Sequence, residues 1–240
     1  MLRYDIINDV INKHNFKTYL EIGVCDPSVC FDKVICDTKH GVDPGVEFED
    51  NPVDYKMTSD DFFYFLDVQE DPRKYDVVFI DGLHKSYQVQ TDIVNSLRYL
   101  NPNGYIILHD CNPPDIHMAR EDYMVNGRYE PWNGTTWKAI YWARTHRTDL
   151  NVLTVDTDWG IGIIRNNLKL NTPLVQNHNP FYEFNIMDAN REEDLGLISI
   201  NDFKNYIADQ NWIHRISLEK EAYKWDNINL TWIGRQFNVD

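Results

Sequence analysis

The stretch YDVVFIDG, residues 75–82, contains four consecutive apolar residues that run directly into Asp81 and Gly82, with His84 close behind. A continuous apolar run of this length predicts a strand that is buried on both faces of a sheet. Because such a strand needs helices on both sides, it favours an α/β domain with a parallel sheet. The carboxylate and the histidine at its end raise the question of whether they belong to a functional site.

Helices and strands alternate around this stretch. The spacing of apolar residues predicts helices at 3–14, 28–36, 59–66 (with Ser59 as N-cap) and 135–145, and one more that carries Val89, Ile93, Leu97 and Leu100. Apolar runs predict strands at 18–24, 39–45, 54–59, 75–82, 105–110, 150–156 and 160–166. Because only a short turn joins the last two strands, that pair is expected to be antiparallel. The sequence predicts a doubly wound, mostly parallel seven-stranded α/β sheet with an antiparallel last strand.

The residues after 166 differ in character from the rest of the chain. They are rich in Asn and Asp and show only patchy periodicity. We therefore expect one domain over residues 1–166 and a C-terminal extension over 167–240 that packs on it. Within the extension, helices are predicted near 200–208 and 217–223.

The composition argues against several classes of partner. The chain has 23 basic and 38 acidic residues and a formal charge of −15, which repels the phosphates of nucleic acids. It has no apolar run of about 18 residues, so no membrane span is expected, and its polar start is unlike a signal peptide. The four cysteines, at 25, 30, 36 and 111, form no CxxC pair, so we expect free thiols in a reducing, cytoplasmic compartment.

Polar residues stand at the carboxyl ends of the predicted strands, where open α/β sheets bind ligands. They are Glu21, Gly23, Asp43, Asp81, His109 and Asp110. A glycine at position 23 lets a ligand approach the backbone, but a GxGxxG dinucleotide fingerprint is missing because Cys25 takes the place of its second glycine. Asp43 either binds the hydroxyls of a ribose or belongs to a simple Asp-Pro-Gly turn.

Five segments resemble those of class I S-adenosylmethionine-dependent methyltransferases in their order and spacing. They are LEIGV (20–24), GVDP (41–44), MTSDDFF (57–63), FIDGLHKSY (79–87) and YIILHDCNPP (105–114). The resemblance covers roughly residues 15–166 and is closest to the branch that includes the metal-dependent sugar O-methyltransferases of macrolide biosynthesis. It implies the Rossmann-like methyltransferase fold and S-adenosyl-L-methionine as the cofactor.

The resemblance also implies which residues bind this cofactor. Glu21 and Gly23 would lie against its methionine part, and Asp43 would hold its ribose hydroxyls. Met57 and Ser59 would lie by the adenine. Asp81, at the end of the strongest strand, would face the cofactor as well as the acceptor.

The same branch uses a divalent metal and a histidine base. Carried over by position, Asp81 and Asp110 would hold Mg or Mn, and His84 would take the proton of the acceptor hydroxyl. His109 stands where the family more often has a second carboxylate, so it is either a third metal ligand or a residue that points into the sheet. Considered alone, His84 is also explained as a residue that opens the following helix.

The loop at residues 111–133 is the expected acceptor site because it is long and rich in polar and aromatic side chains. Its candidate substrate-binding residues are Asn112 and Trp132. The resemblance favours a sugar hydroxyl of a glycan or glycoconjugate as acceptor, and a small phenol or a peptide stays open. The oligomeric state is also open, with a homo-oligomer or an association or fusion with glycan-assembly enzymes as options. Two other classes stay open: a non-catalytic nucleoside-binding module, and a metal-dependent hydrolase or lyase built on Asp81, His84, His109 and Asp110.

Overall fold

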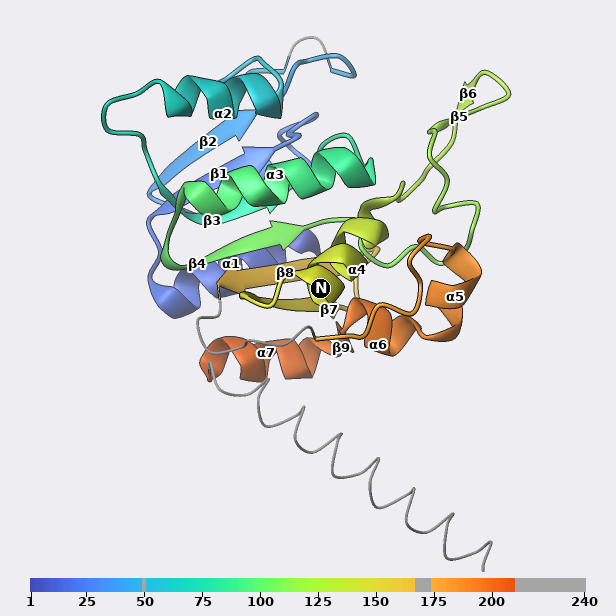
Figure 1. Ribbon diagram of the computed structural model, residues 1–240. Helices are drawn as coiled ribbons and strands as arrows, with labels where there is room; N and C mark the ends of the chain where they lie inside the picture. Colours follow the sequence, from blue (N-terminus) through green and yellow to red (C-terminus); the bar gives the residue numbers. More distant parts are fainter. Residues whose placement is uncertain (49–50, 167–173, 210–240) are drawn as a thin grey trace, which may run out of the picture. The chain divides into compact units, whose positions relative to one another are not determined.

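The computed structural model describes residues 1–48, 51–166 and 174–209, which form parts of two compact units, residues 1–200 and 201–240 (Figure 1). The first unit contains a seven-stranded sheet in the order β2-β1-β3-β4-β8-β7-β9. The strands are β1 (Thr18–Ile22), β2 (Thr38–Val42), β3 (Tyr75–Ile80), β4 (Leu100–Leu108), β7 (Leu150–Val155), β8 (Ile161–Asn166) and β9 (Leu197–Ile198). Strand β8 runs antiparallel to both its neighbours, and the other pairs are parallel. The predicted mostly parallel sheet with one antiparallel strand is confirmed.

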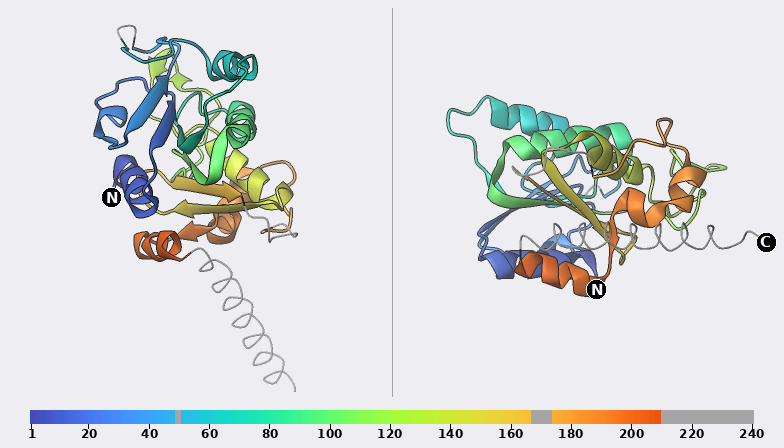
Figure 2. Two further views of the ribbon diagram at one scale, coloured as in Figure 1. Left: turned by 90° about the vertical axis from the view of Figure 1, so that its left-hand side faces the viewer. Right: turned by 60° about the horizontal axis from the view of Figure 1, so that its bottom comes forward.

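Helices cover both faces of this sheet. Figures 1 and 2 show α1 (Arg3–His14) on one face, and α2 (Ser59–Asp67) and α3 (Ser86–Arg98) on the other. Helix α4 (Thr136–His146) packs against α3 and β7. The centre of β3 is fully buried, as its apolar sequence predicts, since Val77, Val78 and Phe79 have no exposed surface.

The remaining elements of the first unit are short. They are the 3₁₀ helix η1 (Phe31–Lys33), the hairpin β5 (Met124–Val125) and β6 (Arg128–Tyr129), α5 (Phe184–Ala189) and α6 (Arg191–Leu195). Because β9 pairs with β7, the first unit continues past residue 166, where the sequence places the domain boundary. In the second unit, α7 (Ile200–Ala208) forms where a helix is predicted. The helix predicted at 217–223 lies outside the described residues.

Two predicted elements are reduced in the structure. The helix expected over 28–36 is only η1, because Cys30 and Val34 are buried while Val29 and Ile35 are exposed, which leaves too narrow an apolar face for a longer helix. The strand expected over 54–59 is a single parallel bridge between Val42 and Tyr55.

The reason for the missing strand lies in its hydrogen bonds. Tyr55 forms backbone hydrogen bonds with residues 41 and 43. The Gly41 N–H, however, donates to the carboxylate of Asp54 at 2.8 Å, and the Met57 N–H donates to the carbonyl of Tyr55. The ladder therefore stops after one residue. If this bridge is counted as the third strand in the chain, then β3, β4, β7 and β8 are the fourth to seventh strands. In this numbering the order across the sheet is 3-2-1-4-5-7-6, followed by β9.

Smaller differences concern helix and loop boundaries. Thr58, not Ser59, is the N-cap of α2 and accepts the Asp61 N–H, and Leu100 begins β4 rather than ending α3. The 111–133 loop contains the β5–β6 hairpin, whose turn residues Asn126 and Gly127 both have positive φ, as a tight hairpin turn requires. Figure 1 shows this hairpin extending away from the sheet. Within the described residues, no helix is long and apolar enough to cross a bilayer.

Candidate active site

A cavity of about 380 Å³ opens at the carboxyl ends of β1, β3 and β4. The residues that line it come from several parts of the chain: helix α1, the end of β1 and the loop after it, the loop after β2, the ends of β3 and β4, the base of the β5–β6 hairpin, and the β7–β8 turn. Residues of the predicted site that line it are Glu21, Gly23, Asp81, His84, His109, Asp110 and Trp132. Seven of the residues singled out from the sequence are thus gathered around one cavity.

Gly23 is needed at the floor of this cavity for a packing reason. Its φ is +85°, and a Cβ placed there would lie 2.3 Å from the Asp81 carbonyl oxygen. The ends of β1 and β3 therefore approach each other so closely that only glycine fits. This packing requirement holds whether or not a ligand is bound.

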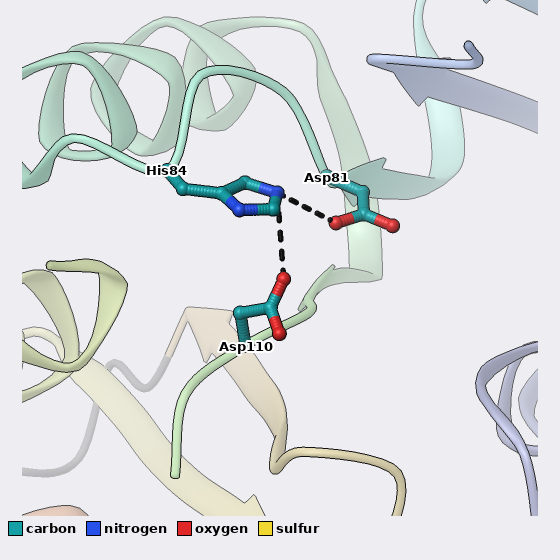
Figure 3. Close-up of side chains that lie close together, drawn as sticks. All are labelled: Asp81, His84 and Asp110. Carbon is teal, nitrogen blue, oxygen red and sulfur yellow. Dashed lines mark hydrogen bonds and ion pairs between the residues drawn. The ribbon is translucent and has the colours of Figure 1, made fainter. Parts of the chain in front are cut away.

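Asp81, His84 and Asp110 form the polar centre of the site (Figure 3). His84 Nε2 lies 3.1 Å from Asp81 Oδ1 and 3.4 Å from Asp110 Oδ2. Burial lowers the pKa of His84, but the hydrogen bond that His84 donates to Asp81 and the negative charges of Asp110 and Asp81 outweigh it, so this pKa is raised above 6.5. The imidazole is held between two carboxylates that stabilise its protonated form.

His109 lies on the other side of the same carboxylates. Its Nδ1 is 2.9 Å from Asp110 Oδ2 and 3.2 Å from Asp81 Oδ1, and its Nε2 is 3.6 Å from Asp158 Oδ1. Burial opposes a charge on His109, yet these three carboxylates raise its pKa well above the usual value. His109 therefore faces the carboxylates of the site and does not point into the sheet.

Arg3 and Asp158 also belong to the site, and the sequence did not single them out as site residues. The Arg3 guanidinium donates to Asp81 Oδ2 at 2.8 Å and, through Nε, to Asp158 Oδ2 at 3.1 Å. Arg3 is the first residue of α1, far from the strand-end motifs in sequence, and Asp158 lies in the β7–β8 turn. No local pattern at either position points to the cavity, so only the fold reveals them.

Glu21 is a buried acid at the end of β1 that lines the cavity. It is 1% exposed, and Tyr19 Oη donates to its Oε2 at 2.5 Å. Burial raises the pKa of Glu21 to about 8, although the hydrogen bond from Tyr19 works in the opposite direction. Glu21 is therefore mostly neutral at pH 7.

Three predicted cofactor residues do not line the described part of the cavity. The carboxylate of Asp43 accepts the backbone N–H groups of Cys25 at 2.9 Å and Gly45 at 2.6 Å, so it shapes the turn in which it lies. Met57 packs partly buried against the core. Ser59 accepts a hydrogen bond from Gln88 at 3.2 Å.

The two predicted acceptor residues have different surroundings. The Trp132 ring centroid lies 5.6 Å from that of His84 and 5.8 Å from that of Tyr123, and both aromatic residues line the cavity. Asn112 instead bonds to Asp156 at 3.0 Å and Arg191 at 2.6 Å and is not among the described residues that line the cavity. Trp132 therefore faces the site, whereas Asn112 ties neighbouring loops together.

Comparison with known proteins adds a family-level match. Residues 27–111 match the model of a family described as a methyltransferase domain, and no curated protein gives a significant match. Structural similarity is found to the O-methyltransferase TomG of Streptomyces achromogenes, solved with S-adenosylmethionine (12% identity, 69% of this chain and 79% of that one, TM-score 0.47). An O-methyltransferase of Bacillus cereus solved with S-adenosylhomocysteine is also similar (14% identity, 68% of this chain and 78% of that one, TM-score 0.42). So is the Podospora anserina methyltransferase PaMTH1 (14% identity, 69% of this chain and 78% of that one, TM-score 0.44).

The segment that matches the family model runs from the loop after β1 to the end of β4, and so contains the ends of β2, β3 and β4. It contributes Asp81, His84 and Asp110 to the cavity. The strand order around it is that of the Rossmann-like methyltransferase fold. Residues 27–111 are thus similar to a methyltransferase domain, while the class I methyltransferase activity and its metal-dependent sugar branch stay predictions.

Proposed function

We propose that the chain is an S-adenosylmethionine-dependent O-methyltransferase whose acceptor is a sugar hydroxyl of a glycan or glycoconjugate. One observation carries the proposal: a single cavity at the strand ends is lined by Glu21, Gly23 and the Asp81–His84–Asp110 cluster. Ligands of open α/β sheets bind at this place. The methyltransferase-domain match over residues 27–111 supports the same activity.

The cavity residues fit the cofactor. Gly23 exposes its backbone without a side chain. The buried Glu21 carboxyl can ionise and pair with the ammonium group of the cofactor's methionine part. When bound, S-adenosylmethionine supplies an activated methyl group on a positively charged sulfur. Trp132 and Tyr123 offer flat apolar surface to an acceptor ring beside His84, which suits the apolar face of a sugar.

His84 is the proposed general base. A sugar hydroxyl is a weak nucleophile, so it must lose its proton as the methyl group is transferred. His84 Nε2 is the ring nitrogen that faces the two carboxylates, whereas Nδ1 is buried and makes no hydrogen bond within the described residues. Neutral His84 would accept the hydroxyl proton, and the Nε2–H of the resulting imidazolium would donate to Asp81 Oδ1.

The same cluster fits a divalent cation. Asp81, His84 and Asp110 each offer a ligand atom within 4.8 Å of the others. We propose Asp81 and Asp110 as the residues that would hold Mg or Mn, which lowers the pKa of an acceptor hydroxyl and fixes its direction. Arg3 keeps Asp81 in place from the opposite oxygen. The two carboxylates then serve the metal, and His84 keeps the role of base.

The expected setting is the cytoplasm. All four cysteines are free thiols, which supports a reducing compartment. The acidic composition supports a small-molecule or glycan acceptor over a nucleic acid.

Transfer of tritium from S-adenosyl-[methyl-³H]methionine to a panel of methyl glycosides and catechol tests the proposal. Wild-type protein should label at least one glycoside, and His84→Ala should lose this labelling by about 10²-fold or more while it still binds S-adenosylhomocysteine. His146→Ala, which removes an exposed histidine at the far end of α4, is the matched control and should keep full activity. Labelling of catechol alone would overturn the sugar acceptor. No labelling of any acceptor, together with no binding of S-adenosylhomocysteine, would overturn the proposal that the chain is a methyltransferase.

A further inference from the structure

The two arms of the 117–131 segment are joined by one side chain, Arg120. Its Nη1 donates to the carbonyl oxygens of His117 at 2.8 Å and Pro131 at 3.1 Å. Its Nη2 donates to those of Tyr123 at 3.3 Å and Glu130 at 2.7 Å. The guanidinium thus connects residues that precede the β5–β6 hairpin with residues that follow it.

Two of these four carbonyls belong to residues that line the cavity. Tyr123 and Pro131 line the cavity themselves, and Pro131 is directly followed by Trp132. The Trp132 ring in turn lies 5.6 Å from His84. Arg120 is not among the described residues that line the cavity, so it affects the site only through the backbone that it holds.

Few backbone bonds fix this region without Arg120. Among the described residues, β5 and β6 form ladder contacts through two residue pairs, and the Glu130 N–H bonds to the Tyr123 carbonyl at 3.2 Å. On the far side of Trp132, the N–H groups of Asn133 and Gly134 bond to the Met118 carbonyl at 2.9 and 3.2 Å. An isolated two-stranded hairpin is at best marginally stable, so a charged donor that bonds to both arms adds substantially to its order.

We propose that Arg120 is a positioning residue of the acceptor site: by holding both arms of the hairpin through their carbonyls, it keeps Trp132 against His84. This inference rests on the proposed function, because it gives the Trp132–His84 contact a role in binding an acceptor ring. The guanidinium donates four hydrogen bonds to backbone carbonyls. Arg120 therefore orders the site rather than touching the acceptor.

The contact can be followed without an acceptor by ¹⁹F NMR of protein labelled with 5-fluorotryptophan. The chain has seven tryptophans, and the Trp132 resonance is assigned by its loss in Trp132→Phe. In the wild-type background, His84→Ala should shift this resonance, because the imidazole lies next to the indole. In Arg120→Met, the Trp132 resonance should move or broaden, and His84→Ala should no longer shift it. Arg120→Lys, which keeps one charged donor group, should restore part of the shift.

Arg128→Met is the matched control, because Arg128 lies in β6 of the same hairpin and makes no side-chain hydrogen bond within the described part of the chain. It should leave both the Trp132 resonance and its response to His84→Ala unchanged. Hydrogen exchange provides a second readout: peptides over 117–134 should exchange about tenfold faster in Arg120→Met and not in Arg128→Met, with β3 and β4 unaffected.

Calorimetry with S-adenosylhomocysteine separates this inference from the proposed function. Wild type, Arg120→Met and Arg128→Met should bind it equally, since Arg120 is away from the cofactor side. An unchanged Trp132 resonance and unchanged exchange in Arg120→Met would overturn the positioning role. Failure of all three proteins to bind S-adenosylhomocysteine would overturn the proposed function while leaving the ¹⁹F result to decide the role of Arg120.

Discussion

Glu21 provides a quantitative test of where the cofactor binds. Burial raises its pKa to about 8 in the free protein, so at pH 7 the carboxyl holds about 0.9 of a proton. If the ammonium group of the cofactor's methionine part binds beside Glu21, the positive charge favours the carboxylate and lowers this pKa. A fall to near the ordinary value of 4.5 would release about 0.9 of a proton per cofactor bound.

Isothermal titration calorimetry measures this release directly. S-adenosylhomocysteine is titrated at pH 7 in phosphate and in Tris, whose ionisation enthalpies differ widely, and the slope of the observed enthalpy against the buffer enthalpy gives the number of protons exchanged. By linkage, the affinity should also rise nearly tenfold between about pH 6 and pH 7 and level off above about pH 8. Glu21→Gln keeps the shape of the side chain but cannot ionise, so it should bind with no proton release from this site.

Two outcomes would refute the reasoning about Glu21. Binding that releases no proton in wild type would mean that the ligand does not reach the Glu21 carboxyl. Equal release in wild type and Glu21→Gln would assign the proton to another group.

Four further predictions concern the site and the stability of the fold. The pH profile of kcat/KM should rise with pH as His84 loses its proton, because neutral His84 is the proposed base; a flat profile between about pH 6 and pH 9 would contradict this role. Thorough chelation with EDTA should abolish methyl transfer and Mn should restore it, whereas undiminished activity would remove the proposed metal from Asp81 and Asp110. Arg3→Met should lower the free energy of unfolding in urea by about 2 kcal/mol, since it leaves the carboxylates of Asp81 and Asp158 without their guanidinium, while the exposed Lys13→Met on the same helix should change it by less than about 0.5 kcal/mol. Because the folded state raises the pKa of Glu21, stability should fall as pH rises from about 4.5 to about 8, and Glu21→Gln should gain up to about 3 kcal/mol at pH 7; equal stability curves for the two proteins would contradict the raised pKa.

The parts of the fold that the sequence predicts well are those fixed by strong local patterns. The apolar runs of β1, β3 and β4 can only be buried strands, and the polar residues after them are gathered because parallel strands end at one edge. The strand predicted at 54–59 does not form, because the N–H groups of Gly41 and Met57 donate to the Asp54 carboxylate and the Tyr55 carbonyl instead of continuing the ladder. No pattern of apolar residues reveals these hydrogen bonds. The Asn126-Gly127 turn is a readable hairpin signal, and counting it would have predicted β5 and β6.

The site shows a similar division. Asp81, His84 and Asp110 follow adjacent strands, so their meeting could be predicted. Arg3 and Asp158 could not, because one begins an ordinary amphipathic helix and the other lies in a hairpin turn, and only tertiary packing brings them to Asp81. Arg120 is a third such case, since its role depends on carbonyl groups that the sequence does not orient.

The central claim is that S-adenosylmethionine binds in the cavity at the strand ends that Glu21, Gly23 and the Asp81–His84–Asp110 cluster line. A crystal structure of the full chain grown with S-adenosylhomocysteine tests it most directly. The account predicts electron density for the ligand inside the cavity, with its amino-acid part beside Glu21 and Gly23 and its sulfur directed toward His84. Density at another place on the molecule, or an empty cavity at a saturating ligand concentration, would contradict it.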